Sequence, residues 1–425
     1  MISLPMVVAM ILALIALNMR LYLAIIAGVL VYFLFINPIP INIAAQRLVA
    51  PTLNVAFLAV PFFVLLGTLL SFTGIATRLL GLADLLVGRL RGGMALANVM
   101  LSTLMGGMSA SNLADASMTA RMMVPEMERN GYSRAFAAAV TAASSLITPI
   151  IPPGIALIIY ALLANVSVGR MFLAGILPGL TLAVLLMLTT YVIARRRGYK
   201  PTRTTWPAPA ETGRIVLGAW PAVVVVVAVV GGIRLNVFTP TEAGAFAVFL
   251  VLVLGLFVYR DMRFHHVLSA LVETGKVTAS IMLVVMASSA LAWVFALEQM
   301  GQVLALTFAG VTESPLALLF VLNLLFLVLG TLVEGTALMI ILVPILLPTV
   351  LALGVDPIHF GIIIIVNLSI GTLTPPIGTV MLVVCNISRV QVSDFLREGA
   401  GFYLALFIGL AVITMVPELS LFLTR

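Results

Sequence analysis

The sequence predicts an all-α polytopic membrane protein with about ten to twelve transmembrane helices. Of its 425 residues, 63% are hydrophobic and only 9% are charged, whereas an average soluble domain is about a quarter charged. Several apolar runs approach the roughly 20 residues that a membrane-spanning helix needs, for example residues 316–329. Backbone amides in hydrocarbon must be satisfied internally, so these runs should be helices, and they lack the alternation of a membrane β-barrel.

One hydrophilic stretch, residues 195–214, divides the chain. It carries six basic residues against the single acid Glu211, and three prolines make it a poor helix. We expect a basic cytoplasmic linker there, between a first membrane half at 1–194 and a second at 215–425. Cytoplasmic loops of membrane proteins are rich in Lys and Arg. Basic residues in such loops explain the net charge of +7. A nucleic-acid partner is therefore not expected.

The amino-terminal run, residues 1–17, is apolar but lacks the basic start and small-residue cleavage site of a signal peptide. We expect the first membrane span there. Farther along, the sequence Thr239–Glu242 is typical of a capping box that opens a helix.

Two segments depart from one crossing per apolar run. Residues 92–127 and 316–353 are apolar at both ends but polar in the middle, at Ser109–Asn112 and Glu334–Thr336 respectively. A re-entrant helical hairpin, with a polar tip buried in protein, fits each segment. The alternative is a pair of full spans joined by a short loop.

An internal repeat supports the hairpins. At an offset of 223 residues the same residue types recur in the same order. The matches are Gly107 with Gly330, Ala114 with Ala337, Pro125 with Pro348, Pro152-Pro153 with Pro375-Pro376, and Phe172 with Phe395. Tracing the loop charges predicts that the two halves run in opposite directions through the membrane, which is an inverted-topology repeat of the kind common in ion-coupled transporters.

Each half also contains a proline pair within an apolar helix, at Thr148–Gly154 and Gly371–Gly378. Proline lacks an amide hydrogen and clashes with the preceding turn, so the helix should unwind there. The freed carbonyls could bind a hard cation, which prefers oxygen ligands. The half-helix after the break would present its positive dipole end to a carboxylate. The alternative is a simple kink.

The polar hairpin tips should complete two pseudo-equivalent cation sites with the substrate between them. Ser109, Ser111 and Asn112 supply oxygens near the first break, and Glu334 and Thr336 do so near the second. Asn367 precedes Thr374 by about two helical turns on the same face. Of the ionisable residues, Asp115 and Glu334 are the best functional candidates within the membrane, although either could cap a hairpin helix.

No enzyme signature is present. The sequence has no cluster of His, Cys or acidic residues with metal-ligand spacing. It has no nucleophile elbow, P-loop or dinucleotide-binding glycine pattern. An enzymatic function is therefore not expected.

Over essentially its whole length the chain resembles the large, DctM-like membrane subunit of tripartite ATP-independent periplasmic (TRAP) transporters. The stretches that carry the resemblance are Pro61–Phe63 with Gly67, Ser109–Asp115 with Pro125, Gly131–Tyr132, Phe136–Ser145, Ile150–Pro153, Phe172–Gly175, Pro178–Gly179, Phe238–Ala243, His359–Gly361 and Gly371–Gly378.

The resemblance implies an inner-membrane permease that works as an elevator. It implies two partners, a small four-helix membrane subunit and a periplasmic substrate-binding protein. A sodium gradient, not ATP, would drive import of small organic acids such as dicarboxylates, sialic acid or other sugar acids. No cofactor is expected apart from sodium as the coupling ion.

The resemblance also implies site residues. Sodium ligands are expected among Ser109, Ser111, Thr148, Pro152, Glu334, Thr336, Gly371, Thr374 and Pro375. Substrate contacts are expected from Ser109, Asn112, Pro153, Thr336, Asn367 and Pro376.

Some positions depart from the family pattern. Ala110 stands where Gly is usual, Thr148 where Gly is usual, and Gly154 where Ser is usual. Arg121 replaces a commonly small residue. These departures bear most on which residues would bind sodium at the first site. A standalone sodium-coupled carboxylate symporter with similar hairpins remains the alternative function, and a passive channel is a further one.

Overall fold

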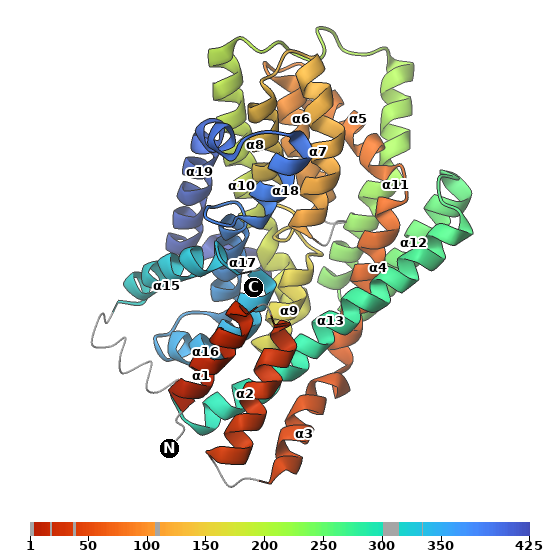
Figure 1. Cartoon of the computed structure of the whole chain (residues 1–425). Helices are drawn as coiled ribbons and strands as arrows, with labels where there is room; N and C mark the ends of the chain where they lie inside the picture. The colour runs from red at the N-terminus through yellow and green to blue at the C-terminus, as the bar shows by residue number, and fades with distance from the viewer. Residues whose placement is uncertain (1–3, 18, 37–39, 107–110, 301–313, 334) are drawn as a thin grey trace.

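The computed structural model describes residues 4–17, 19–36, 40–106, 111–300, 314–333 and 335–425. Within these ranges every regular element is helical, and no strand occurs. The all-α prediction is therefore confirmed for the described part of the chain. Figure 1 shows the helices packed into one elongated body, with the long helix α13 (Phe264–Leu297) crossing it diagonally.

The remaining helices follow in chain order. The first half contains α1 (Leu4–Ala16), α2 (Leu21–Phe35), α3 (Ile41–Val49), α4 (Ala59–Ser71), α5 (Ile75–Val87), α6 (Gly93–Met105), α7 (Asn112–Arg129), α8 (Arg134–Ser145), α9 (Ile155–Leu163) and α10 (Val168–Arg197). The second half adds α11 (Pro209–Arg234), α12 (Pro240–Val253), α15 (Pro315–Gly330), α16 (Gly335–Ala352), α17 (Pro357–Gly371), α18 (Thr379–Ser388), α19 (Val392–Met415) and α20 (Glu418–Leu421).

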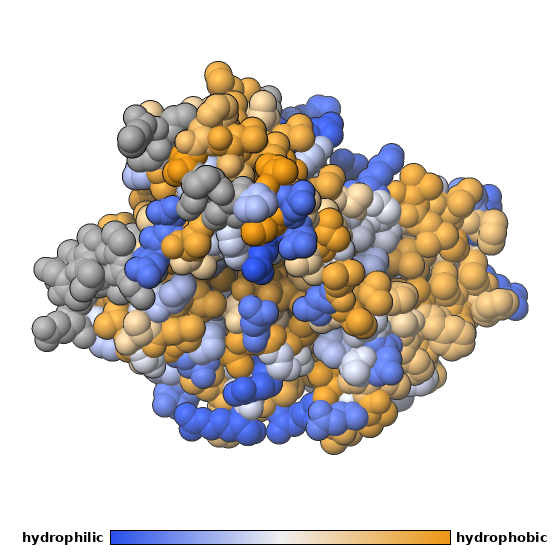
Figure 2. All heavy atoms as spheres, turned by 90° about the horizontal axis from the view of Figure 1, so that it is seen from below, coloured by the Kyte–Doolittle hydropathy of each residue, from blue (hydrophilic) through white to orange (hydrophobic). Residues whose placement is uncertain are grey.

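The helices have the length and composition of a multi-pass membrane protein. Among the described residues, six are long and apolar enough to cross a bilayer, and a bent pair, Ile41–Leu53 with Val55–Ser71, could form a seventh span. Six further apolar helices are shorter, at 10–17 residues. Figure 2 shows apolar side chains spread widely over the face seen from below. The number of ten to twelve spans stays a prediction.

The capping box predicted at Thr239–Glu242 is confirmed at the start of α12. The Thr239 hydroxyl accepts from the Glu242 amide at 3.3 Å, and the Glu242 carboxylate accepts from the Thr239 amide at 2.8 Å. These two bonds satisfy amide groups that a helix leaves open at its first turn. The local sequence therefore fixes where α12 begins.

The basic linker after α10 is anchored to the turn between α5 and α6; it crosses the top of Figure 1. The amides of Thr202 and Arg203 both donate to the Gly88 carbonyl, at 2.9 and 3.1 Å. The Arg203 guanidinium donates to the Asp84 carboxylate at 2.6 Å and to Glu211 at 3.2 Å. The hydrogen bond that Arg203 donates to Asp84 contributes most to raising the pKa of Arg203. The charged guanidinium thus joins the linker to α5.

The helix bounds follow the 223-residue offset seen in the sequence. Helices α7 and α16 begin at residues 112 and 335 and end at 129 and 352. Helices α8 and α17 begin at 134 and 357. Both are interrupted where the proline pairs lie, at residues 146–154 and 372–378, before α9 and α18 resume. The opposite orientation of the two halves stays a prediction.

The break after α17 packs closely against the end of α15. A Cβ added to Gly371 would lie 2.7 Å from the carbonyl carbon of Gly330 and 2.8 Å from its Cα. Backbone atoms cannot move aside as a flexible side chain can, so glycine is required here. This contact between two backbone segments keeps the second break close to the end of α15.

We therefore expect the substitution Gly371→Ala to lower the thermal unfolding midpoint of the purified protein, measured in detergent without sodium. Overpacking of this kind typically costs about 1–3 kcal/mol. The matched control is Gly275→Ala in α13, where an added Cβ meets nothing within 4 Å. It should leave the midpoint unchanged or raise it, because Ala favours a helix over Gly. Equal midpoints for the two variants would contradict the close contact.

Candidate functional site

A cavity of about 410 Å³ lies where the two halves meet. Its walls come from the start of α7, the first break, the start of α16 and the middle of α13. The lining residues are Leu21, Ser111, Asn112, Pro149, Ile155, Ala156, Ile159, Val277, Ser280, Ile281, Val284, Thr336, Ala337 and Ile340. The volume falls within the range of small-molecule sites.

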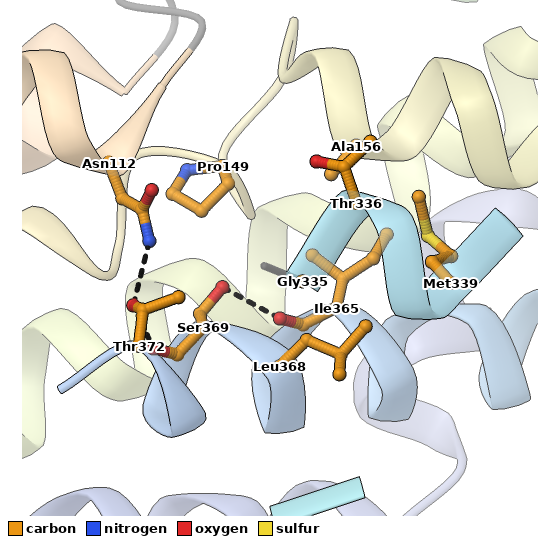
Figure 3. Close-up of a pocket in the computed structure, with 10 residues that line it drawn as sticks. All are labelled: Asn112, Pro149, Ala156, Gly335, Thr336, Met339, Ile365, Leu368, Ser369 and Thr372. Carbon is orange, nitrogen blue, oxygen red and sulfur yellow. Dashed lines mark hydrogen bonds between the residues drawn. The ribbon is translucent and has the colours of Figure 1, made fainter. Parts of the chain in front are cut away.

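A smaller pocket adjoins this cavity and extends it toward the second break. Figure 3 shows its lining, which shares Asn112, Pro149, Ala156 and Thr336 with the larger cavity. The pocket adds side chains from α16 and from α17 and its end, namely Gly335, Met339, Ile365, Leu368, Ser369 and Thr372. Together the two spaces touch both breaks and both helices that follow the predicted tips.

One hydrogen bond joins the halves across this pocket. The Asn112 side-chain amide donates to the Thr372 hydroxyl at 3.0 Å, and the two side chains point toward one another in Figure 3. The Thr372 hydroxyl in turn donates to the Ser369 carbonyl at 2.7 Å. Through this bond the first turn of α7 is linked to the end of α17, although the residues lie 260 positions apart.

Three helices direct their amino-terminal turns at the cavity. Asn112 is the first residue of α7, Ile155 of α9 and Gly335 of α16, and each lines one of the two spaces. The open amide groups and the dipole of a helix place partial positive charge at its amino terminus. The backbone of these three helix starts therefore contributes partial positive charge to the cavity.

No charged side chain lines either space within the described part of the chain. The polar lining consists of hydroxyl and amide groups from Ser111, Asn112, Ser280, Thr336, Ser369 and Thr372. Such groups suit hydrogen bonding to a polar anion, and helix amino termini are ready-made anion sites. The arrangement has no nucleophile–base pair and is built for binding.

Comparison with known proteins identifies the family. Residues 6–419 match the model of the "Tripartite ATP-independent periplasmic transporter, DctM component". The chain belongs to this family. The resemblance inferred from the motifs is thereby confirmed, and the chain is a TRAP transporter permease component and not an enzyme.

Two curated relatives illustrate the range of this TRAP family. The sialic acid TRAP transporter large permease protein SiaM of Vibrio cholerae is 38% identical over 93% of this chain and 92% of its own length. The C4-dicarboxylate TRAP transporter large permease protein DctM of Pseudomonas aeruginosa is 33% identical over 93% and 92%. The crystal structure of the Alcanivorax borkumensis YdaH transporter has a similar fold, with a TM-score of 0.61 and 17% identity over 88% of both chains.

Three of the residues predicted for the TRAP permease site do line the cavity. They are Ser111, Asn112 and Thr336, from the starts of α7 and α16. The Ser111 hydroxyl also caps α7 by accepting from the Ala114 amide at 3.4 Å. Ser109 and Glu334, predicted at the hairpin tips, lie outside the described residues.

Other predicted residues lie near the breaks without lining these two spaces. Thr148 donates to Asp115 at 3.1 Å, and Thr374 donates to the Ile370 carbonyl at 2.8 Å. Gly371 packs on Gly330, as described above. Asn367 is fully buried and donates to Asn323 at 2.7 Å. Their roles in binding sodium or substrate stay predictions.

The two proline pairs have different surroundings. Pro152 and Pro153 are buried, whereas Pro375 is half-buried and Pro376 is exposed. None of the four lines either space; Pro149, three residues before the first pair, lines both. Their contacts with ion or substrate stay predictions as well.

Sequence reasoning assigned no site role to Pro149 or to the polar lining residues Ser280, Ser369 and Thr372. Pro149 lies in the motif Thr148–Gly154 and Thr372 in the motif Gly371–Gly378. Membership in these motifs was the signal that could have identified both residues. Ser280 is an isolated small polar residue in the span-length helix α13, a pattern too common to identify a site. Only packing brings it to the cavity.

The Asn112–Thr372 bond can be tested by a double-mutant cycle with Asn112→Ala and Thr372→Val. We expect a coupling free energy of about 0.5–1.5 kcal/mol in the unfolding of the purified permease, since this is the usual net contribution of one hydrogen bond. The control pair, Asn112→Ala with Thr181→Val, combines distant sites and should be additive. Additive effects of Asn112→Ala and Thr372→Val would show that the halves are not joined by this bond.

Proposed function

We propose that this chain is the large permease subunit of a sodium-gradient-driven TRAP transporter in the inner membrane. It imports a small organic acid that a periplasmic binding protein delivers, and it works beside a separate small four-helix membrane subunit. Family membership supports the transporter class and its tripartite organisation. The relatives named for sialic acid and C4-dicarboxylates support an organic acid as cargo.

The observation that carries the proposal is the cavity faced by the starts of α7, α9 and α16, whose described lining residues are all uncharged. A carboxylate entering it gains three helix dipoles and several hydroxyl or amide donors. No Lys or Arg lines it among the described residues, so the carboxylate is not trapped by a salt bridge. A transporter needs such a site, because the substrate must also leave.

Sodium coupling follows from the same charge balance. Helix dipoles only partly neutralise a carboxylate, each amounting to roughly half an elementary charge. A co-bound cation next to the cavity completes the neutralisation and makes substrate binding depend on sodium. The broken backbone at residues 146–154 and 372–378 offers carbonyl and hydroxyl oxygens beside the cavity, the ligand type that hard cations prefer.

The distribution of apolar cores supports movement of one part against another. One cluster contains buried residues of α1, α2 and α3 together with Ala287–Phe295 of α13. The hairpin helices, the breaks and the helices around them contribute to a larger cluster, which also includes Ala270 and Val285 of α13. We propose that the part containing both breaks moves as an elevator against the part formed by α1, α2, α3 and the end of α13, carrying the cavity between the two sides of the membrane.

The double variant Thr374→Ala with Pro375→Ala should abolish sodium-driven uptake in proteoliposomes while the protein stays in the membrane. It removes the Thr374 hydroxyl and one of the two proline rings from the second break, and so alters the oxygen atoms that this break offers to a cation. The control Thr181→Ala removes a hydroxyl with the same type of bond, to the Leu177 carbonyl at 2.8 Å, from α10. Normal uptake by the double variant would reject the second break as a cation site.

Uptake should require the binding protein and the small subunit. Proteoliposomes containing both membrane subunits are compared with and without substrate-loaded binding protein, under an inward sodium gradient. We expect accumulation only when all three components and sodium are present. Accumulation by this chain alone would favour a standalone sodium–carboxylate symporter, and flux that persists without an ion gradient would indicate a passive channel.

A further inference from the structure

An apolar groove of about 340 Å³ lies on the surface of the first half, apart from the cavity that faces the helix breaks. It is formed by α10, by the start of α6 and by the turn that follows α5. Its lining residues are Leu90, Leu96, Val184, Met187, Leu188 and Tyr191, and none of these six carries a charge. Within the described residues it shares no lining with the cavity or the pocket beside it.

The groove has a packed floor and an exposed rim. Leu96 belongs to a small apolar core between α5 and α6, and Met187 and Tyr191 of α10 pack against this core. Val184 and Leu188, also of α10, are exposed. Because packing already holds the floor in place, an apolar chain can bind here without ordering the protein side chains first.

One end of the groove lies where α10 leaves the membrane. This helix is long and apolar enough to span a bilayer, and it ends in the three arginines Arg195–Arg197, next to the linker that crosses the top of Figure 1. The linker residue Trp206 is exposed, and the guanidinium carbon of Arg89 lies 4.7 Å from the centre of its ring. Aromatic and basic residues gather at membrane–water interfaces, so this end is expected at the depth of lipid headgroups.

Cations from two elements meet at this end. Arg195 follows Tyr191 by four residues, so both lie on one face of α10. The turn after α5 approaches α10 at the same place, because a Cβ added to Gly92 would lie 2.3 Å from the Cβ of Ala194. Arg91 directly precedes Gly92 and therefore lies beside the end of α10.

These cations have no acidic partner. Arg91, Arg195 and Arg196 are exposed and take part in no ion pair among the described residues. The neighbouring Arg197, in contrast, is paired with Glu398. The helix dipole favours arginines at the end of α10, but it does not account for the cation on the turn after α5 or for the apolar groove beside both.

We propose that this groove binds an anionic phospholipid, with an acyl chain along Val184, Leu188 and Tyr191 and the headgroup phosphate at Arg91 and Arg195. A phospholipid provides the apolar chain and the negative charge in one molecule, at the depth where both are needed. Basic pockets between spanning helices suit anionic headgroups for this reason. The inference is independent of sodium coupling, because it uses no residue of the cavity or of the breaks.

Charge complementarity favours a lipid over the other candidate occupant, an apolar helix of a partner protein. Such a helix would cover the groove, but it would leave the guanidinium groups of Arg91 and Arg195 without an anion unless it carried an acid at the same height. A phosphate group instead accepts paired hydrogen bonds from a guanidinium, a geometry for which arginine is well suited.

The test is native mass spectrometry of the purified chain in detergent, titrated with phosphatidylglycerol or with phosphatidylcholine of the same acyl chains. We expect one phosphatidylglycerol to be retained per chain, with a preference of at least about tenfold over phosphatidylcholine, because the cations favour the lipid with a net negative charge. Equal retention of the two lipids would overturn the proposal, since the groove would then be ordinary lipid-facing surface.

The double variant Arg91→Gln with Arg195→Gln removes both cations and leaves the apolar lining intact. It should weaken phosphatidylglycerol binding about 25-fold, since each basic residue near a membrane surface contributes about a factor of five. Phosphatidylcholine binding should not change. The control, Arg170→Gln with Arg234→Gln, removes equal charge from two exposed arginines without an ion pair in the described chain. Equal weakening by both double variants would overturn the site, because overall charge would then explain the binding.

The apolar part of the site is tested by Leu188→Trp, which fills the groove and keeps both cations. It should weaken phosphatidylglycerol binding at least about tenfold, the effect of uncovering about two methylene groups. The control is Leu180→Trp, at an exposed position of α10 that does not line the groove. Unchanged binding by Leu188→Trp would show that the lipid lies elsewhere and would overturn the proposal.

The protein occupant is tested in native membranes with Leu188→Cys and a thiol-reactive cross-linker. The single native cysteine of the chain, Cys385, is buried, so the new thiol is the accessible one. A cross-link from position 188 to another polypeptide would assign the groove to a protein helix and overturn the lipid site. We expect no such cross-link, together with selective loss of phosphatidylglycerol in Arg91→Gln with Arg195→Gln.

Discussion

The structure depends on one constraint: helices that stop in the middle of an apolar body must have their free ends covered by protein. At residues 146–154 and 372–378 the regular backbone bonding of α8 and α17 ends. Lipid cannot satisfy the peptide groups exposed there, so neighbouring helices, polar side chains or bound ions must do so. The close contact of Gly371 with Gly330, the bond between Asn112 and Thr372, and the bond from Thr148 to Asp115 all lie at these ends.

The same constraint generates the binding chemistry. A helix that restarts after a break, or begins after a hairpin tip, exposes amide groups and the positive end of its dipole. Three such starts face one cavity, whose described lining carries no formal charge. Dipoles attract an anion without the strong desolvation cost and tight retention that a buried Lys or Arg would bring. This balance suits a permease, in which binding must be selective and also reversible.

Helices α7 and α8 have counterparts at the 223-residue offset, α16 and α17, whose side chains differ from theirs. Helices α7 and α16 share their length and their spacing from the following broken helix. Even so, the first half buries a carboxylate at Asp115 where the second has Leu338. Matching helix bounds therefore do not carry the same side-chain chemistry from one half to the other.

The sequence by itself determined the membrane class, the breaks at the proline pairs and the capping of α12, because these follow from composition, periodicity and local backbone chemistry. The family followed from the motifs that the chain shares with TRAP permeases. The sequence also singled out Ser111, Asn112 and Thr336, which line the cavity, while their roles as sodium or substrate contacts stay predictions. Only the tertiary structure decided that Ser280 reaches the cavity, that Thr148 is directed to Asp115, and that Asn367 bonds with Asn323. Those outcomes depend on which helix faces meet, and interactions between residues far apart in the chain set these contacts.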